Sequence, residues 1–436
     1  MKLLLMLLAF VPLVAHAEPE SPTYAIWSHS DYKPWQSDVY ARDPQLVLRE
    51  EDWMRGVGIN TYFPLAFASG RVNWSSPTLP DTRDLFGTRS PLDVAVQGGA
   101  ERGIDVHLYF LMGFVGFLED PWAAPDLRAH PEWDVIGPNG RGTLSGQAGT
   151  ATTWGTFLWW DLGNPGVQDR ILASLDEALE RYPTVRGVHL DYVRDPGGGC
   201  FSDPCIDRFQ QATGLSVPEE APDRADYVRT HFGSVYAGWR AGEITALVRR
   251  VRQAVDAHRP GAELSTAVFA DAAGAYAGVS QDWRRWATEG LIDAVYPMFY
   301  GDSRTRQGVG AYVRTTLADL DERASRLAGH RARLVLGLET APYDVLAPEA
   351  AEAAIADAIS NGADGIALEM LPYWWHAEYQ QFRGSYVPQS DSWPPLWDYD
   401  ASLARAFHAA AGQRIDLHRG PSLTGRPPAP ATGPRM

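Results

Sequence analysis

Eight short apolar segments alternate with helix-forming segments along the chain, and this alternation constrains the fold more than any other feature. The apolar segments cover residues 24–29, 59–67, 104–112, 187–193, 263–270, 293–300, 333–340 and 365–371. They are too uniformly apolar for a sheet with one solvent-exposed face, so we expect strands that are buried on both faces. Eight such strand–helix units favour an α/β fold, the closed (βα)8 TIM barrel, over the alternative of an open doubly wound sheet. No Gly-x-Gly-x-x-Gly follows the first segment, so a dinucleotide site lacks its usual signal.

Helix starts and long loops support the same organisation. Asp43, Ser90 and Asn164 each stand directly before a proline, a pairing that is typical of a helix N-terminus. The connections after strands three and four, at residues 113–164 and 195–238, are long and rich in glycine, proline and aromatic residues. In a (βα)8 barrel the loops that follow the strands form the active-site face, so we expect these two long βα loops to carry function.

The two ends of the chain differ from the rest. A short positive start, an apolar run and an Ala-x-Ala site predict a cleaved signal peptide over residues 1–17, and hence a secreted or periplasmic protein. We expect the barrel to cover residues 22–412, which contain no stretch long and apolar enough to span a membrane. The tail at residues 413–436 is rich in proline, glycine and arginine without apolar periodicity, which predicts disorder.

Charge and cysteine content exclude several classes of partner. The net charge of −16 disfavours nucleic acid and anionic membranes, because a polyanion would be repelled. The two cysteines, Cys200 and Cys205, share one loop, and in an oxidising compartment we expect them to form a disulfide. Two thiols without histidine partners make a poor zinc site, and we predict no metal and no cofactor.

Candidate catalytic residues follow from the alternation of side chains along a strand. His189 and Asp191 share one face of strand four, and we expect both to point into the mouth of the barrel. Asp191 ends an apolar run, and a buried carboxylate requires a partner or a catalytic role. Arg194 is an available partner, so the alternative is a purely structural Asp–Arg pair.

The same register brings further carboxylates to the barrel mouth. Glu339 on strand seven and Glu369 on strand eight point inward, and Asp271 and Asp302 follow strands five and six. Glycoside hydrolysis needs two carboxyl groups, one protonated and one ionised, and crowding of like charges raises one pKa. We therefore predict Glu339 or Glu369 as the catalytic partner of Asp191. The alternative for each is a hydrogen-bonded structural acid or an acceptor for substrate hydroxyls.

Aromatic residues are the second signal at the mouth. The chain contains 16 tryptophans, many of them in the expected βα loops. Sugar rings present apolar C–H faces that stack on aromatic rings, whereas core or lid packing is the alternative role for any single ring. We predict that the substrate-binding residues are Trp27, Trp160, Tyr296, Tyr300 and Trp374, together with His189, Tyr192 and Arg194.

Other chemistries lack their motifs. No Gly-x-Ser-x-Gly, His-Glu-x-x-His or Walker-type loop is present in the sequence. An alternative is a metal site of the polysaccharide-deacetylase kind built from His29, Asp31, His107 and His189. We expect inward histidines to be satisfied core residues instead.

A motif around the fourth strand resembles that of a known enzyme family. Residues 164–166 read Asn-Pro-Gly, and residues 186–196 read Arg-Gly-Val-His-Leu-Asp-Tyr-Val-Arg-Asp-Pro. This pattern resembles the signature of the family-10-like glycoside hydrolases, whose relatives include the hydrolase domain of periplasmic poly-N-acetylglucosamine export proteins. Trp239-Arg240 and the strand at residues 293–300 fit the same family. The resemblance covers most of the chain, and it implies a (βα)8 barrel in which the strand-four aspartate, here Asp191, is the catalytic carboxylate.

Two departures limit what carries over from related enzymes. The strand at residues 293–300 also resembles the chitinase-type barrels, whose fourth strand ends Asp-x-Asp-x-Glu. Aligning their second aspartate on Asp191 places Val193 where the acidic glutamate should be, so the usual chitinase mechanism is not available. Glu339 and Glu369 rest on the register argument alone.

The sequence thus predicts hydrolysis of O-glycosidic bonds in a poly- or oligosaccharide. Asp191 would act as acid/base or nucleophile, with His189 and Arg194 tuning it. The alternative is a non-catalytic glycan-binding barrel, which would keep the aromatic residues but lack two carboxyl groups about 5–10 Å apart.

Overall fold

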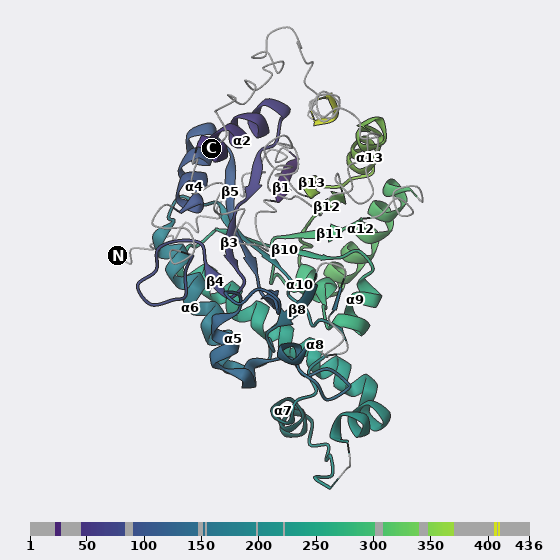
Figure 1. The fold of residues 1–436 in the computed structure, drawn as a ribbon. Helices are drawn as coiled ribbons and strands as arrows, with labels where there is room; N and C mark the ends of the chain where they lie inside the picture. Colours follow the sequence, from purple (N-terminus) through teal and green to yellow (C-terminus); the bar gives the residue numbers. More distant parts are fainter. Residues whose placement is uncertain are drawn as a thin grey trace, which may run out of the picture.

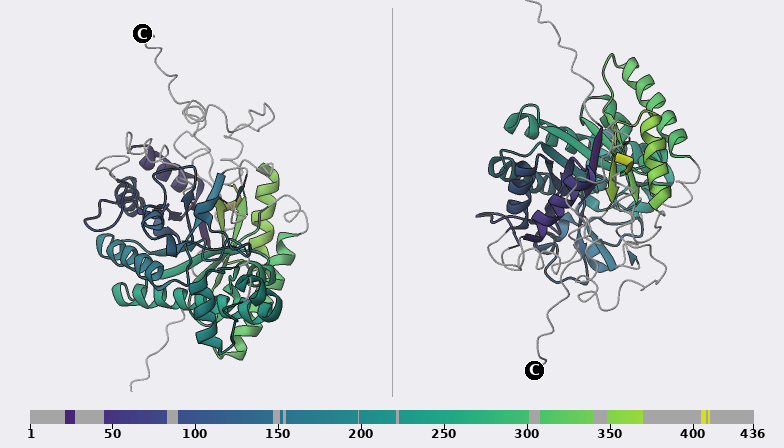
Figure 2. Two further views of the ribbon diagram at one scale, coloured as in Figure 1. Left: turned by 60° about the horizontal axis from the view of Figure 1, so that its bottom comes forward. Right: turned by 90° about the horizontal axis from the view of Figure 1, so that it is seen from above.

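The computed structural model shows a closed barrel of parallel strands surrounded by helices (Figures 1 and 2). It describes residues 22–27, 45–82, 90–146, 151–152, 155–197, 199–220, 223–300, 308–339, 348–369, 405–407 and 409. The strands of the barrel are β1 (Thr23–Trp27), β2 (Thr61–Phe63), β3 (Leu65–Ala68), β5 (Asp105–Leu111), β9 (Gly187–Asp191), β10 (Glu263–Phe269), β11 (Ala294–Met298), β12 (Arg333–Glu339) and β13 (Gly365–Glu369). β1 pairs with β13 and with β2, and β2 pairs with β5, which closes the ring. The predicted closed barrel is confirmed, and the open-sheet alternative is wrong.

The second barrel strand is divided at Pro64. Proline has no backbone N–H to donate to a neighbouring strand, so a strand tends to break where one occurs. β2 and β3 lie on either side of Pro64, and both pair with β5, with a shift of register in β3. The Pro64 carbonyl still accepts a hydrogen bond from the Tyr109 backbone at 3.0 Å. The single strand expected at residues 59–67 is therefore two short strands in one position of the barrel.

Helices cover the outside of the barrel in the described part of the chain. They are α2 (Gln45–Val57), α4 (Pro91–Arg102), α6 (Pro165–Arg181), α8 (Arg224–His258), α9 (Ala272–Val279), α10 (Trp283–Thr288), α12 (Val309–Arg326) and α13 (Pro348–Ser360). The Asn164 side chain accepts from the Gly166 backbone and caps α6 as expected. Ser90 precedes α4 as expected, but its hydroxyl donates to the Asn73 carbonyl instead of capping the helix. Among the described helices, none combines the length and apolar character needed to cross a bilayer.

Alternation along each strand separates two cores. Outward side chains such as Leu190 and Val268 pack against the helices in the larger core. Inward side chains form a smaller core inside the barrel, which includes Tyr296, Val335 and Ala367. Val335 shares a face of its strand with Glu339, and Ala367 shares one with Glu369, so the inward face predicted for these two strands is confirmed.

The long loops after strands three and four are folded insertions. The first contains β6 (Phe114–Phe117), α5 (Pro125–Ala129), β7 (Ala151–Thr152) and β8 (Gly155–Trp159), and the three strands form an antiparallel sheet in the order β6-β8-β7. The second contains α7 (Asp203–Thr213) and continues into the first half of α8, and the two helices share a small core that includes Phe209 and Tyr236. Figure 1 shows α7 at the bottom, away from the barrel strands. The prediction of long connections at these two points is confirmed. The predicted signal peptide and tail lie outside the described residues.

Candidate active site

Asp191 is the last residue of β9, and its carboxyl group lies at the carboxyl end of the barrel strands. The side chain is 8% exposed and has three donors close to it. The Tyr109 hydroxyl donates to Oδ2 at 2.8 Å, the Tyr192 backbone N–H donates to Oδ1, and Arg194 Nη1 lies 3.3 Å from Oδ1. Asp191 is therefore held in one orientation while it keeps a narrow opening to solvent.

The surroundings of Asp191 favour its protonated form. Burial raises the pKa of this carboxyl and outweighs the opposing effects of Arg194, the Tyr192 N–H and the Tyr109 hydroxyl. A carboxyl whose pKa is raised can retain a proton at a pH where an exposed aspartate has lost it. That property is required of a general acid in glycoside hydrolysis.

Tyr192 and Arg194 lie beside Asp191, as expected from the sequence. Tyr192 has a φ of 54°, in the left-handed region that non-glycine residues seldom adopt. Its ring contacts that of Trp159, with centroids 5.5 Å apart. The Arg194 guanidinium carbon lies 4.1 Å from the Tyr192 ring centroid and 4.4 Å from that of Phe269. Arg194 therefore links the carboxyl of Asp191 to two aromatic rings.

The structure corrects the prediction for His189, Trp27 and Tyr296, which were expected to bind substrate. All three are enclosed in the barrel interior, and His189 and Tyr296 are fully buried. His189 Nε2 accepts from Trp27 Nε1 at 2.8 Å, and its Nδ1 lies 2.8 Å from the Ser265 hydroxyl. Burial holds the pKa of His189 well below its usual value, with a further contribution from His107. These residues pack in the barrel interior beneath Asp191, where they are too buried to contact a sugar.

Trp160 is a second correction. Its side chain is 1% exposed and belongs to the outer core, where its ring lies near Phe67 and Trp133. The tryptophan follows β8 in the insertion and packs that insertion onto the barrel, so it does not face the mouth. The core-packing alternative applies to this residue.

The positions of Glu339 and Glu369 along the barrel follow from the strand topology. Glu339 and Glu369 end β12 and β13 and are direct partners in the register of these strands. The ring has eight strand positions, and β13 lies four positions from β9 in either direction. Glu369 therefore lies across the mouth of the barrel from Asp191. Asp271 was also expected at the mouth, but its carboxylate accepts from two backbone N–H groups and caps α9. Tyr300 follows β11 and is half-buried. Trp374 and Asp302 lie outside the described residues.

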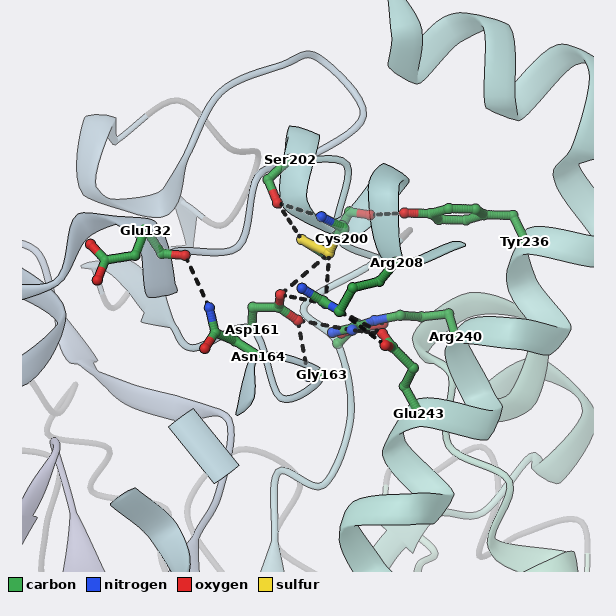
Figure 3. The surroundings of a disulfide bond; sticks show 12 residues. Glu132, Asp161, Gly163, Asn164, Cys200, Ser202, Arg208, Tyr236, Arg240 and Glu243 are labelled. Carbon is green, nitrogen blue, oxygen red and sulfur yellow. Dashed lines mark hydrogen bonds and ion pairs between the residues drawn. A yellow bond between two sulfur atoms is a disulfide. The ribbon is translucent and has the colours of Figure 1, made fainter. Parts of the chain in front are cut away.

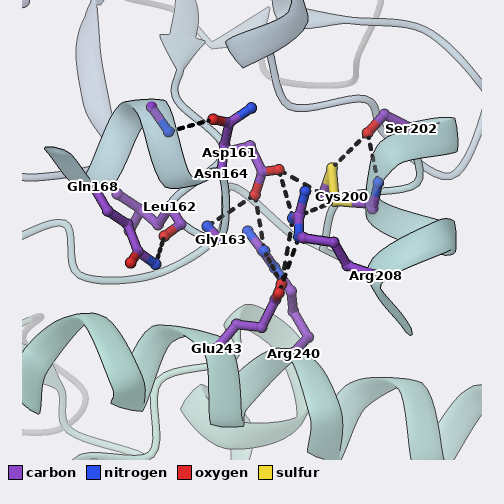
Figure 4. A network of polar contacts seen from close by, with 12 residues as sticks. Asp161, Leu162, Gly163, Asn164, Gln168, Cys200, Ser202, Arg208, Arg240 and Glu243 are labelled. Atoms are coloured by element: carbon purple, nitrogen blue, oxygen red, sulfur yellow. Dashed lines mark hydrogen bonds and ion pairs between the residues drawn. A yellow bond between two sulfur atoms is a disulfide. The ribbon is translucent and has the colours of Figure 1, made fainter. Parts of the chain in front are cut away.

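A buried ionic network fixes the segment that follows Asp191. Arg240 of α8 is 1% exposed and binds Asp195 at 2.7 Å and Asp161 at 2.8 Å. Arg208 of α7 contacts Asp161 at 2.9 Å and Glu243 at 3.0 Å. Figures 3 and 4 show dashed contacts from the Asp161 carboxylate to both Arg208 and Arg240. The network joins the two insertions to α8 and holds Asp195, four residues beyond Asp191, in a fixed place.

Cys200 and Cys205 form a disulfide, which confirms the sequence prediction (Figure 3). Cys205 Sγ lies 3.3 Å from an Asp161 oxygen, so the disulfide adjoins the ionic network. Asp161 and the two cysteines are the only group with metal-like spacing among the described residues, and the disulfide uses both sulfurs. Of the residues considered for a deacetylase-type metal site, His29 and Asp31 lie outside the described residues.

His107, another of those residues, is buried inside the barrel, where burial, assisted by Arg333 and Arg186, lowers its pKa to about 3. Tyr109 and Phe269 are site residues that the sequence reasoning missed. Both lie on inward positions of their strands, so the alternation rule could have found them if it had been applied to strands three and five.

The closed barrel with a buried acid at the end of its fourth strand places the chain in the class of TIM-barrel glycoside hydrolase-like proteins. Residues 43–353 match the family described as glycosyl hydrolase-like 10, and the chain belongs to this family, in agreement with the resemblance noted in the sequence.

Comparisons with individual proteins are consistent with this assignment. The Glycosyl hydrolase DigH of Escherichia coli (strain K12) is 24% identical over 332 residues, which cover 66% of this chain and 68% of DigH. The PgaB (BpsB) glycoside hydrolase domain from Bordetella bronchiseptica superimposes with a TM-score of 0.57 at 15% identity, covering 85% of this chain and all of that domain. A β-galactosidase from the psychrophilic Marinomonas ef1 gives a TM-score of 0.56 at 12% identity, over 89% of this chain and 59% of the enzyme. Both structural matches support the barrel fold.

Proposed function

We propose that the chain is a secreted glycoside hydrolase that cleaves O-glycosidic bonds of a poly- or oligosaccharide by carboxylate acid/base catalysis. One observation carries the proposal: Asp191 stands at the strand ends with a raised pKa, a narrow opening to solvent and three fixed donors. Family membership supports a glycosidase-type role, and Asp191 supplies the residue that such chemistry requires.

The reaction assigns different roles to two carboxyl groups. Asp191, as the group with the raised pKa, donates a proton to the glycosidic oxygen as the leaving sugar departs. An ionised carboxylate from across the mouth of the barrel, that of Glu369 or of its neighbour Glu339, acts as base or nucleophile. The separation between the two reacting carboxyl groups sets the stereochemistry, because an inverting enzyme needs room for a water molecule between them.

Two further properties support a secreted enzyme with a neutral substrate. The net charge of −16 would repel a polyanionic glycan. The Cys200–Cys205 disulfide is of the kind that persists in an oxidising compartment, in agreement with the signal-peptide pattern at residues 1–17.

The test is hydrolysis of a glycan panel by the wild type and by Asp191→Asn. The substitution keeps the shape of the side chain and removes its ability to exchange a proton, so we expect activity to fall at least a hundredfold. Asp271→Asn is the matched control, because asparagine also caps a helix and Asp271 follows the next strand, β10. Equal activity of Asp191→Asn and wild type on every cleaved glycan would refute the assignment.

Two outcomes of the same panel separate the proposal from its rival. Loss of activity in Glu369→Gln or Glu339→Gln would identify the second carboxylate. Binding of glycans by the wild type without cleavage of any of them would favour the glycan-binding barrel, in which Asp191 and Arg194 form a structural pair.

A further inference from the structure

Phe269 is an exposed aromatic ring on the strand next to Asp191. It ends β10, on the same inward-facing set as Ser265 and Ala267, which are both buried inside the barrel. Phe269 itself is 39% exposed, because it stands at the carboxyl end of the strand. The register pairs Leu190 with Thr266, so Phe269 rises one inward position above the level of Asp191.

The backbone that carries this ring is held in place by buried side chains. The Phe269 N–H donates to the Gln281 side-chain oxygen at 2.8 Å, and the Phe269 carbonyl accepts from Trp283 Nε1 at 3.1 Å. Gln281 is fully buried, and its amide nitrogen also lies 3.5 Å from the Val193 carbonyl. One side chain therefore ties the end of β10 to the segment that directly follows Asp191.

Charge and stacking connect the ring to the candidate catalytic carboxyl. The Arg194 guanidinium lies over one face of Phe269 at 4.4 Å and reaches Asp191 Oδ1 at 3.3 Å. Arg194 covers one face of the ring, and Phe269 still keeps 39% of its surface exposed to solvent. A partly exposed aromatic ring on a tethered backbone, beside a polar cluster, is an arrangement suited to binding the C–H face of a pyranose.

We propose that the exposed face of Phe269 is a sugar-stacking subsite, which positions one pyranose ring of a neutral oligosaccharide next to the bond at Asp191. The inference rests on the proposed function, since it names a binding residue of the same site. The preference for a neutral sugar follows from the chemistry of the contact, which is apolar. In the described part of the chain the cation recorded over this ring is Arg194, whose Nη1 is already paired with Asp191.

Binding by calorimetry tests the subsite, with Asp191→Asn as the background so that no substrate is consumed. The probes are cello-, xylo-, malto- and N-acetylchito-oligosaccharides of increasing length. We expect Phe269→Leu, which keeps apolar bulk but removes the ring, to weaken binding of the recognised series about threefold to tenfold. Phe269→Trp restores stacking and should bind as the background does. Tyr276→Leu is the matched control, because Tyr276 is 40% exposed but its hydroxyl lies against Gly238 of α8.

Kinetics separate a substrate contact from an effect through Arg194. In the otherwise wild-type enzyme we expect Phe269→Leu to raise KM while the pH profile of kcat stays in place. A displaced pH profile with an unchanged KM would show that Phe269 acts only by positioning Arg194, which overturns the proposal. Unweakened binding by Phe269→Leu, an equal loss in Tyr276→Leu, or failure of all four neutral series to bind would overturn it as well.

The two proposals fail in different ways. Cleavage that depends on Asp191 but not on Phe269 removes the subsite and leaves the hydrolase. Binding that depends on Phe269 without cleavage of any glycan removes the hydrolase and leaves the subsite on a glycan-binding barrel.

Discussion

Glu51 offers a test of the packing between α2 and α4 that is independent of any substrate. Its side chain is fully buried, and neither carboxyl oxygen has a hydrogen-bond partner. The nearest cation is Arg102, whose Nη1 lies 3.7 Å away and whose Nε is bound to Asp52. A Cβ at Gly98 of α4 would fall 2.1 Å from a Glu51 oxygen, so the two helices meet closely here. Burial raises the pKa of Glu51 from 4.5 to about 8.

The direction of the pH effect follows from the raised pKa. Below pH 4.5 both the folded and the unfolded chain carry the protonated acid, and Glu51 costs the folded state no ionisation energy. Above pH 4.5 the unfolded chain ionises first, so stability falls until the pH passes about 8, where the folded group ionises too. At 1.36 kcal/mol per pKa unit the loss is about 3 kcal/mol at pH 7 and about 5 kcal/mol above pH 8.

The perturbation is Glu51→Gln, which imitates the protonated acid at every pH. We expect urea unfolding to give equal stability for variant and wild type near pH 4.5, and a more stable variant by about 3 kcal/mol at pH 7. Glu101→Gln on the exposed surface of α4 is the control and should change stability little at any pH. A stability difference that stays constant from pH 4.5 to 9, or a variant less stable than wild type at pH 7, would refute the reasoning.

Three further predictions concern the site and its supports. Tyr109→Phe removes a hydrogen bond that stabilises the ionised Asp191 carboxylate. The apparent pKa that Asp191 contributes to the pH profile of kcat/KM should therefore rise by about 1–2 units. An unchanged or lower apparent pKa contradicts this prediction. Arg240→Met leaves the buried carboxylates of Asp161 and Asp195 without the cation that they share. The free energy of unfolding measured in urea should fall by about 3–5 kcal/mol. A loss below about 1 kcal/mol would show that the fold does not depend on this network. Replacing Cys200 and Cys205 together by serine should cost about 2 kcal/mol in thermal unfolding, and a reductant should then no longer affect the midpoint.

Strand periodicity predicted the barrel and the face of each strand correctly. It could not predict how deep in the barrel interior each inward side chain lies. His189 and Asp191 share one face of β9, and both were expected at the mouth. The two residues differ by one inward position, and that step separates a fully buried imidazole from a carboxyl with access to solvent. The alternation of side chains tells which face of the strand a residue lies on. It does not tell which inward residue lies at the mouth of the barrel. Tyr296 was misplaced for the same reason.

Contacts between distant segments were also beyond a reading of the sequence. Trp160 was assigned to sugar binding because it lies in a long loop, but the tertiary fold of that loop buries the ring in the outer core. The pairing of Arg240 with Asp195 joins residues that are 45 positions apart, and no local pattern specifies it. The disulfide, in contrast, closes over five positions in one loop and was predictable.

The Asp161 network has a consequence for exchanging parts between related barrels. Asp161 belongs to the third βα loop, whereas Arg208 belongs to the fourth and Arg240 to the helix that follows it. A chimera that receives only one of these loops would enclose a charge without its counterpart, whichever loop is grafted. The two loops and the first half of α8 would therefore have to be transferred together in such an exchange.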